Sequence, residues 1–233
     1  MYEVVIKPCG GSALLIQFEQ KIDPSVLQQV TAVKNKIAGS RIPGILDMIP
    51  AYASLMILYD PAVISFQKMK ERILSLDMEG QETVKVTQRR IEIPVLYGPP
   101  FPEDLAFVAL CAAMSTEEVI GIHTANEYPV YMIGFLPGFP YLGNLDERIH
   151  TPRRKEPRTH IPAGSVGIGG AQTGVYPVAS PGGWHIIGKT PLKLYDPERE
   201  DPVLLRSGDL VTFRSITKKE FDEIERSGGR ICL

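Results

Sequence analysis

The chain has 233 residues, 44% hydrophobic and 22% charged, which allows two globular domains with real cores. Its formal net charge of -2 excludes a general attraction to nucleic acid or to an anionic membrane surface. No apolar run reaches the roughly 18 residues that span a bilayer, no secretory signal pattern opens the chain, and the three cysteines are widely spaced. We therefore expect a cytoplasmic protein that binds neither nucleic acid nor a membrane.

Residues 1–90 are expected to alternate strands and helices. One helix begins at Asp23-Pro24 and ends at Gly39, and a second begins at Asp60-Pro61, because an N-cap followed by proline is a helix start signal. The order strand, helix, strand occurs twice and predicts a ferredoxin-like α/β domain. The expected strands are Val4–Ile6, Ala13–Phe18, Ile45–Ile49, Ala53–Tyr59 and Ile91–Val95.

Residues 91–233 have a different composition. Two short helices are expected first, the second opened by a capping box of Ser115 and Glu118, and a last helix is opened by Thr217 and Glu220. Between them, short β-branched or aromatic runs separated by glycine and proline predict a closed or nearly closed β-barrel, so the fold class is α+β. The expected strands are Val166–Ile168, Trp184–Ile187, Leu192–Tyr195, Val203–Leu205 and Leu210–Phe213.

A basic stretch at 148–158 and the glycine-rich segment Pro162–Lys189 are the candidate anion or substrate site. Guanidinium groups grip carboxylates and phosphates with paired hydrogen bonds, and glycine-rich turns present backbone N–H groups to oxyanions. The alternative is a solvated charged loop. The candidate residues are Arg153, Arg154, Arg158, Gln172, Thr173, Tyr176 and Lys189.

The segment Gly134–Gly143, GFLPGFPYLG, is both stiff and rich in aromatic rings. Exposed aromatic side chains anchor protein interfaces, whereas core packing is the alternative for rings of this type. The candidate partner-binding residues are Phe135, Phe139, Tyr141 and Trp184.

Motifs for catalysis, nucleotide binding and metal binding are weak. Gly183–Thr190, GWHIIGKT, matches the spelling of a Walker A loop, but it is expected to be a strand and not the turn that opens a helix. Four dispersed histidines predict no metal site. No catalytic triad is visible, and no catalytic residue is assigned.

The segments YMIGFLPGFPYLGNL, TPRRKEPRTHIPAGSVGIGGAQTGVYPVASPGGWHIIGKTPLKLYDP and LLRSGDLVTF resemble the KipI/PxpB family, which includes the B subunit of 5-oxoprolinase. The resemblance covers essentially the whole chain and implies a cyclophilin-like β-barrel after a small α/β domain. YGPPFPEDL at Tyr97–Leu105 departs from the more glycine-rich turn that is usual in the family.

The resemblance implies one of two functions. The chain is either the B subunit of an ATP-dependent 5-oxoprolinase, acting with partners similar to the A and C subunits of that enzyme, or an inhibitor that binds the dimerisation and phosphotransfer domain of a sporulation sensor histidine kinase. ATP would be used by the complex, with no cofactor bound by this chain alone. The Ala-Met-Lys-Met biotin attachment pattern is absent, so no biotin is expected. Prolyl isomerase activity follows only from likeness of fold, which is weak support.

The functional prediction depends on one arrangement: the arginines of 148–158 should share a concave surface with Gln172, Tyr176 and Lys189.

Overall fold

The computed structural model describes residues 4–21, 23–76 and 89–229. The chain divides into two compact units, Met1–Gln88 (unit 1) and Arg89–Leu233 (unit 2), and each is described by itself. The polar segment Glu79–Arg90, which precedes the strand expected at Ile91–Val95, lies outside the described residues except for Arg89 and Arg90. Within the described ranges, no single helix is long and apolar enough to cross a membrane.

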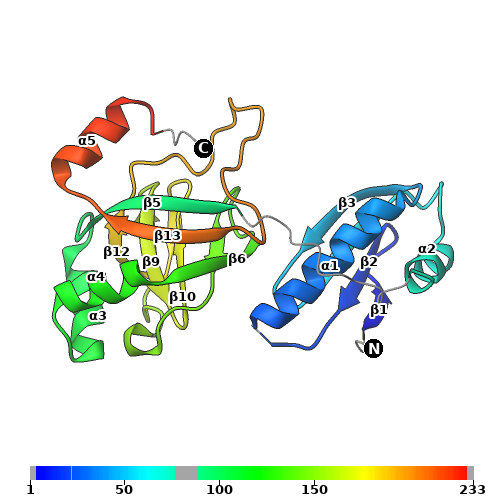
Figure 1. The fold of residues 1–233 in the computed structure, drawn as a ribbon, viewed down its shortest axis with the longest axis horizontal. Coiled ribbons are helices and arrows are strands. Elements are labelled where there is room, and N and C mark those ends of the chain that lie inside the picture. Colours follow the sequence, from blue (N-terminus) through cyan, green and yellow to red (C-terminus); the bar gives the residue numbers. More distant parts are fainter. Residues whose placement is uncertain (1–3, 22, 77–88, 230–233) are drawn as a thin grey trace. The chain divides into compact units, whose positions relative to one another are not determined.

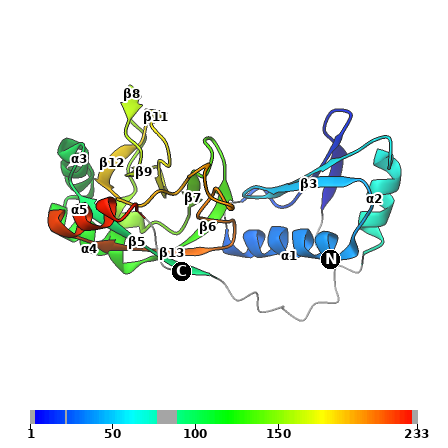
Figure 2. The ribbon, with the colours of Figure 1, turned by 90° about the horizontal axis from the view of Figure 1, so that it is seen from above.

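Unit 1 is a four-stranded antiparallel sheet in the order β1-β2-β4-β3, with helix α1 along one face (Figure 2). Its core is formed by the apolar stripe of α1 and the inward-facing residues of β2 and β4. Its elements are β1 (Val5–Pro8), β2 (Ala13–Gln17), α1 (Pro24–Ser40), β3 (Ile45–Pro50), β4 (Ser54–Tyr59) and α2 (Phe66–Leu74).

Helix boundaries in unit 1 follow the capping side chains. The carboxylate of Asp23 accepts a hydrogen bond from the Ser25 amide and begins α1 as expected. The expectation that Asp60-Pro61 begins α2 is wrong, because Asp60 accepts from the Ala62 amide in a turn and Ser65 is the N-cap. The end expected for α1 at Gly39 is also displaced, since the left-handed C-cap is Arg41.

The ferredoxin-like arrangement predicted for residues 1–90 is not found as expected. A fold of that type places the strand that follows its second helix in the same sheet. In the described part of the chain, the strand that follows α2 is β5 (Arg90–Tyr97). It belongs to unit 2, where it pairs with β13 (Leu210–Ser215) and β12 (His185–Lys189). The edge beside β2 is occupied instead by β1, which forms a hairpin with β2.

Unit 2 is built on a closed seven-stranded barrel in the order β10-β7-β6-β13-β5-β12-β9 (Figure 1), which supports the cyclophilin-like fold. A separate ribbon of β8 and β11 extends from it (Figure 2). The elements of unit 2 that follow β5 are α3 (Pro102–Ala112), α4 (Thr116–Ala125), β6 (Glu127–Ile133), β7 (Pro140–Leu142), the 3-10 helix η1 (Glu147–Ile149), β8 (Arg158–Ile161), β9 (Ser165–Gly169), β10 (Gln172–Val175), β11 (Ser180–Gly182), β12 (His185–Lys189), β13 (Leu210–Ser215) and α5 (Lys218–Arg226).

The helix starts expected in unit 2 are confirmed, and two of its expected strands are not. The capping boxes at Ser115 and Thr217 both form, and they begin α4 and α5. The strands expected at Leu192–Tyr195 and Val203–Leu205 are reduced to a single bridge between Tyr195 and Val203. Helices α3 and α4 meet at 87° and lie on the same side of the barrel (Figure 1). Helix α3 packs against β12, and Asp104 in its first turn accepts a hydrogen bond from the Ile186 amide on that strand.

We predict that Gly143→Ala destabilises unit 2. A Cβ atom at Gly143 would lie 1.8 Å from Cε2 of Tyr131, whose ring is buried. Overpacking of this kind costs about 1–3 kcal/mol of unfolding free energy, measurable by urea denaturation. The control is Gly121→Ala in α4, where no atom lies within 4 Å and alanine should be stabilising by about 0.5–1 kcal/mol. Equal stability of Gly143→Ala and the native protein would contradict the packing described.

Candidate functional site

A buried carboxylate organises the most charged part of unit 2. Asp104 lies in the first turn of α3, and only 1% of its side chain is exposed. Arg158 donates to both carboxylate oxygens, at 2.6 and 3.0 Å, and Arg154 donates to Oδ1 at 2.8 Å. The backbone amide of Ile186 donates to Oδ2 at 2.8 Å. These four hydrogen bonds replace the hydration that the carboxylate loses on burial.

The same contacts fix the segment 152–158, which we call the basic loop. The amide of Arg154 donates to the carbonyl of Gly183 at 2.8 Å. The Arg158 guanidinium lies 3.9 Å above the ring of Phe101 and also donates to Glu103 at 2.9 Å. Both arginines were expected to bind an external anion, and in this structure carboxylates of α3 occupy them instead.

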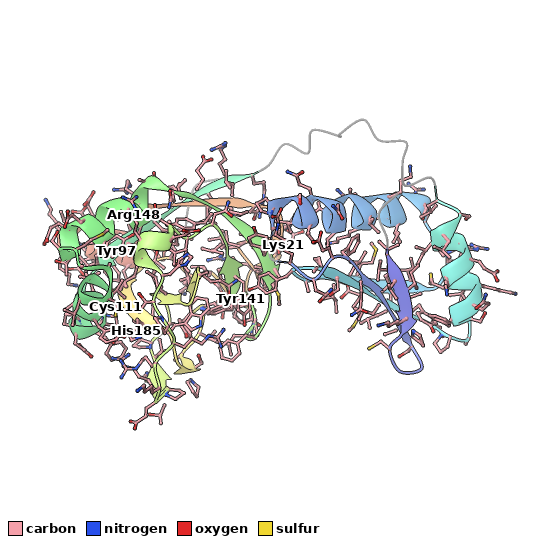
Figure 3. All side chains as sticks on the ribbon, turned by 90° about the horizontal axis from the view of Figure 1, so that it is seen from below. Lys21, Tyr97, Cys111, Tyr141, Arg148 and His185 are labelled. Atoms are coloured by element: carbon pink, nitrogen blue, oxygen red, sulfur yellow. The ribbon has the colours of Figure 1, made fainter. Side chains whose placement is uncertain are left out.

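His185 lies beside this cluster at the start of β12, beneath α3 (Figure 3), and its ring stacks on Phe107. Its Nε2 is 3.1 Å from the carbonyl oxygen of Pro152, which can only accept, so Nε2 carries the proton. Burial lowers the pKa of His185 and keeps the ring neutral, although nearby Asp104 acts in the opposite direction. The Nδ1 atom is buried, 3.8 Å from Asp104 Oδ1, without a hydrogen-bond partner in the described structure.

A cluster of aromatic rings lies next to the basic loop, and we call it the aromatic face. Phe139 is at its centre, with ring centroids 4.9 to 5.7 Å from those of its four neighbours. Trp184 packs tightly into the barrel, because a Cβ atom at Gly169 would lie 2.5 Å from its ring. The aromatic face consists of Phe135, Phe139, Tyr141, Tyr176 and Trp184.

These rings differ in their exposure. Phe139, Tyr176 and Trp184 are buried, so for them core packing is the state observed. Phe135 is 63% exposed and has a left-handed backbone with φ of 66°, which is unfavourable for a bulky residue and is typical of functional loops. Tyr141, on β7, is half-buried (Figure 3).

Arg153 lies over the aromatic face. It is exposed, and its guanidinium carbon is 5.9 Å from the centroid of the Trp184 ring. Burial raises the pKa of Tyr176 to about 12 and raises that of Tyr141, and the positive charge of Arg153 opposes both shifts, so it acts on both hydroxyls. Among the residues that the structure describes, no carboxylate forms an ion pair with Arg153.

Thr173 is inside the barrel rather than at a surface. Its hydroxyl donates to the carbonyl of Gly167 at 3.0 Å and therefore accepts from Nε2 of His123 at 2.9 Å. His123 Nδ1 in turn accepts from the Tyr97 hydroxyl at 2.7 Å. These bonds use the proton and one acceptor position of the buried Thr173 hydroxyl, so in this structure the side chain belongs to the interior of the barrel.

The remaining candidates lie on the barrel strands β10 and β12, and Arg148 lies in η1. The ammonium of Lys189 lies 5.6 Å from the ring of Phe221 on α5. Gln172 is half-buried at the start of β10. Arg148 pairs with Asp146 through two hydrogen bonds. Of the predicted common surface, the structure brings Arg153 together with the candidate Tyr176 and the rest of the aromatic face. A shared surface of the basic loop with Gln172 and Lys189 stays a prediction.

Asp104 was not among the site residues predicted from the sequence. Its position directly after Pro102 and Glu103 is typical of an acidic residue that complements a helix N-terminus, so its sequence context gives no sign of burial. No group of three metal-ligating side chains occurs among the residues described here.

Comparison with known proteins defines the class of the chain. The carboxyltransferase domain family, subdomains C and D, matches residues 4–205. The chain is 46% identical over 226 residues to the 5-oxoprolinase B subunit of Bacillus subtilis (strain 168), covering 93% of this chain and 94% of that protein. It is 42% identical to the 5-oxoprolinase B subunit of Escherichia coli O157:H7, covering 88% and 92%. The chain therefore belongs to the carboxyltransferase C and D family and, within it, to the B subunits of 5-oxoprolinase.

A solved structure gives the same fold. The crystal structure of TTHA0988 superposes with a TM-score of 0.78 at 34% identity over 91% of this chain. This chain spans 40% of the length of that protein.

We predict that Asp104→Asn lowers the unfolding free energy by about 2–4 kcal/mol, because removing one member of a buried ion cluster leaves the arginines uncompensated. Glu103→Gln is the matched control on the preceding residue. Its carboxylate is 63% exposed, so its loss should cost less than about 1 kcal/mol. Urea denaturation measures both. Equal effects of the two substitutions would show that the Asp104 cluster contributes no more than a surface pair.

A second prediction concerns pH. Burial lowers the pKa of His123 from 6.5 to about 3, so the unfolded chain binds a proton below pH 6.5 that the folded chain does not. Stability should therefore fall as the pH decreases from about 6.5 toward 3. His123→Gln should reduce the loss of stability between pH 7.5 and 5 by about 2 kcal/mol.

Urea denaturation at both pH values tests this prediction. The control is His160→Gln at an exposed histidine, which should leave the pH dependence of the unfolding free energy as it is in the native protein. An unchanged pH dependence in His123→Gln would contradict the assignment.

Proposed function

We propose that this chain is the B subunit of an ATP-dependent 5-oxoprolinase, which opens 5-oxoproline to glutamate. The observation that carries the proposal is its 46% identity to a B subunit of 5-oxoprolinase over nearly the full length of both chains. Similarity at this level over a whole domain supports a shared activity more strongly than likeness of fold does.

The proposal assigns the nucleotide and part of the catalysis to partner proteins resembling the A and C subunits of that enzyme. Opening a lactam with ATP requires stabilisation of developing oxyanions and of a transferred phosphoryl group. The segment that matches the Walker A spelling forms strand β12, ending at Lys189, and does not open a helix. The ATP site therefore belongs, in this proposal, to the assembled complex.

No cofactor is proposed for this chain itself. Lys68 and Lys70 flank Met69 on helix α2, where Met69 is buried in the core of unit 1. The Ala-Met-Lys-Met attachment pattern is absent and these lysines lie on a helix, so we propose that the chain carries no biotin.

The test is reconstitution. The chain is purified together with its A-type and C-type partner proteins, and ATP hydrolysis is measured with and without 5-oxoproline. We expect 5-oxoproline-dependent hydrolysis that is lost when this chain is omitted and restored when it is added back. Full activity of the partner proteins without this chain, or no co-purification and no activity with it, would overturn the proposal.

A further inference from the structure

We propose that Arg153 and the aromatic face form a binding site for a small cyclic amide or imino acid that carries a carboxylate. The guanidinium of Arg153 binds the carboxylate, and the aromatic side chains provide an apolar surface for the ring. This inference rests on the proposed function, since 5-oxoproline is a five-membered lactam with one carboxylate.

Arg153 differs from the neighbouring arginines in its ion pairing. Arg154 and Arg158 are held by Asp104, and Arg158 is also bound by Glu103. In the described part of the chain, Arg153 has no such ion pair, and it is exposed. A guanidinium that is presented on a fixed loop and lacks a carboxylate partner is suited to binding one from a ligand.

The backbone that carries Arg153 is held in place by hydrogen bonds. Arg153 is held from both sides: the Pro152 carbonyl before it accepts a hydrogen bond from Nε2 of His185, and the Arg154 amide after it donates to the carbonyl of Gly183. The anchoring of Arg158 on Asp104 fixes the far end of the basic loop. Little conformational entropy of the loop is lost when a ligand binds, which favours a small ligand with few contacts.

Aromatic side chains surround the guanidinium of Arg153. Its guanidinium carbon is 5.9 Å from the Trp184 ring, and its charge acts on the hydroxyls of Tyr141 and Tyr176. Tyr141, which is half-buried, and the exposed ring of Phe135 both pack against Phe139 at the edge of the aromatic face, where they provide an apolar surface for a small ring next to a cation.

The competing occupant is a carboxylate side chain of a partner protein, because tryptophan, tyrosine and arginine are also typical of protein interfaces. The two occupants predict different kinetics. A substrate carboxylate bound by Arg153 makes the KM for 5-oxoproline depend on this residue, whereas an interface contact changes the affinity between the proteins of the complex.

The experiment compares Arg153→Met, Arg153→Lys and the control Arg148→Met in the reconstituted complex at saturating partner concentration. Arg148 is also exposed but pairs with Asp146, outside the aromatic face. We expect Arg153→Met to raise the KM for 5-oxoproline about 10- to 100-fold with kcat changed less than about twofold, as for loss of a charged hydrogen bond. Arg153→Lys should recover part of the loss, and Arg148→Met should match the native chain.

A second readout does not depend on the activity of the complex. Trp184 is the single tryptophan of the chain, so its fluorescence reports on this site alone. If the complex is inactive, the isolated chain is titrated with L-5-oxoproline, and a saturable change that Arg153→Met weakens at least tenfold supports the site although the proposed function fails. If the complex is active and Arg153→Met leaves KM within twofold of native, the site is overturned and the function stands. The site is also overturned if the complex is inactive and the Trp184 fluorescence shows no change that depends on Arg153. If Arg153→Met alters the affinity for the partner proteins while the KM stays unchanged, Arg153 belongs to a protein interface and not to the proposed site.

Discussion

The arrangement of the basic loop depends on the burial of one carboxylate. Asp104 accepts hydrogen bonds from two arginines and from the backbone of β12, and it thereby joins the first turn of α3, the basic loop and one strand of the barrel. A buried charge is tolerated only with this degree of pairing. The three connected segments are therefore constrained to a single arrangement, in which Arg154 and Arg158 turn toward α3 and Arg153 lies over Trp184.

The interior of the barrel is specified by a second polar network. Tyr97, His123 and Thr173 form a chain in which each donor has one acceptor, and the last acceptor is the carbonyl of Gly167. The neutral, Nε2-protonated form of His123 is the one compatible with this order. Such a network favours one register of the surrounding strands, because a shifted strand would leave buried polar groups without partners. The external site and the barrel core are thus fixed by different networks.

The features that sequence analysis predicted well are those with local causes. The capping boxes at Ser115 and Thr217 and the alternating pattern of β2 and β4 involve neighbours within a few residues. The start of α2 was misplaced because Asp60-Pro61 is equally suited to a turn. The strand at residue 91 was counted in the strand–helix–strand pattern of the first domain, although the predicted boundary lies before it, because strand order in the sequence does not state which sheet a strand joins.

The candidate site was predicted only in part, since it depends on distant pairs. Asp104 is 50 and 54 residues from its arginine partners, and nothing in the local sequence of α3 indicates them. A cluster of arginines is visible in the sequence, but which of them remain unpaired is decided by tertiary structure. The same is true of the aromatic loop, where Phe139 is buried and Phe135 is exposed although both lie in one glycine- and proline-rich segment.

The central claim is that Asp104 holds the basic loop in place, and amide hydrogen exchange tests it most directly. The amide of Arg154 is protected by its bond to Gly183, whereas the amide of Val211 belongs to the barrel ladder between β13 and β6. In Asp104→Asn, we expect exchange at Arg154 to accelerate at least about tenfold relative to exchange at Val211, because local opening of the loop no longer breaks a charged network. An unchanged ratio of the two exchange rates would contradict the account.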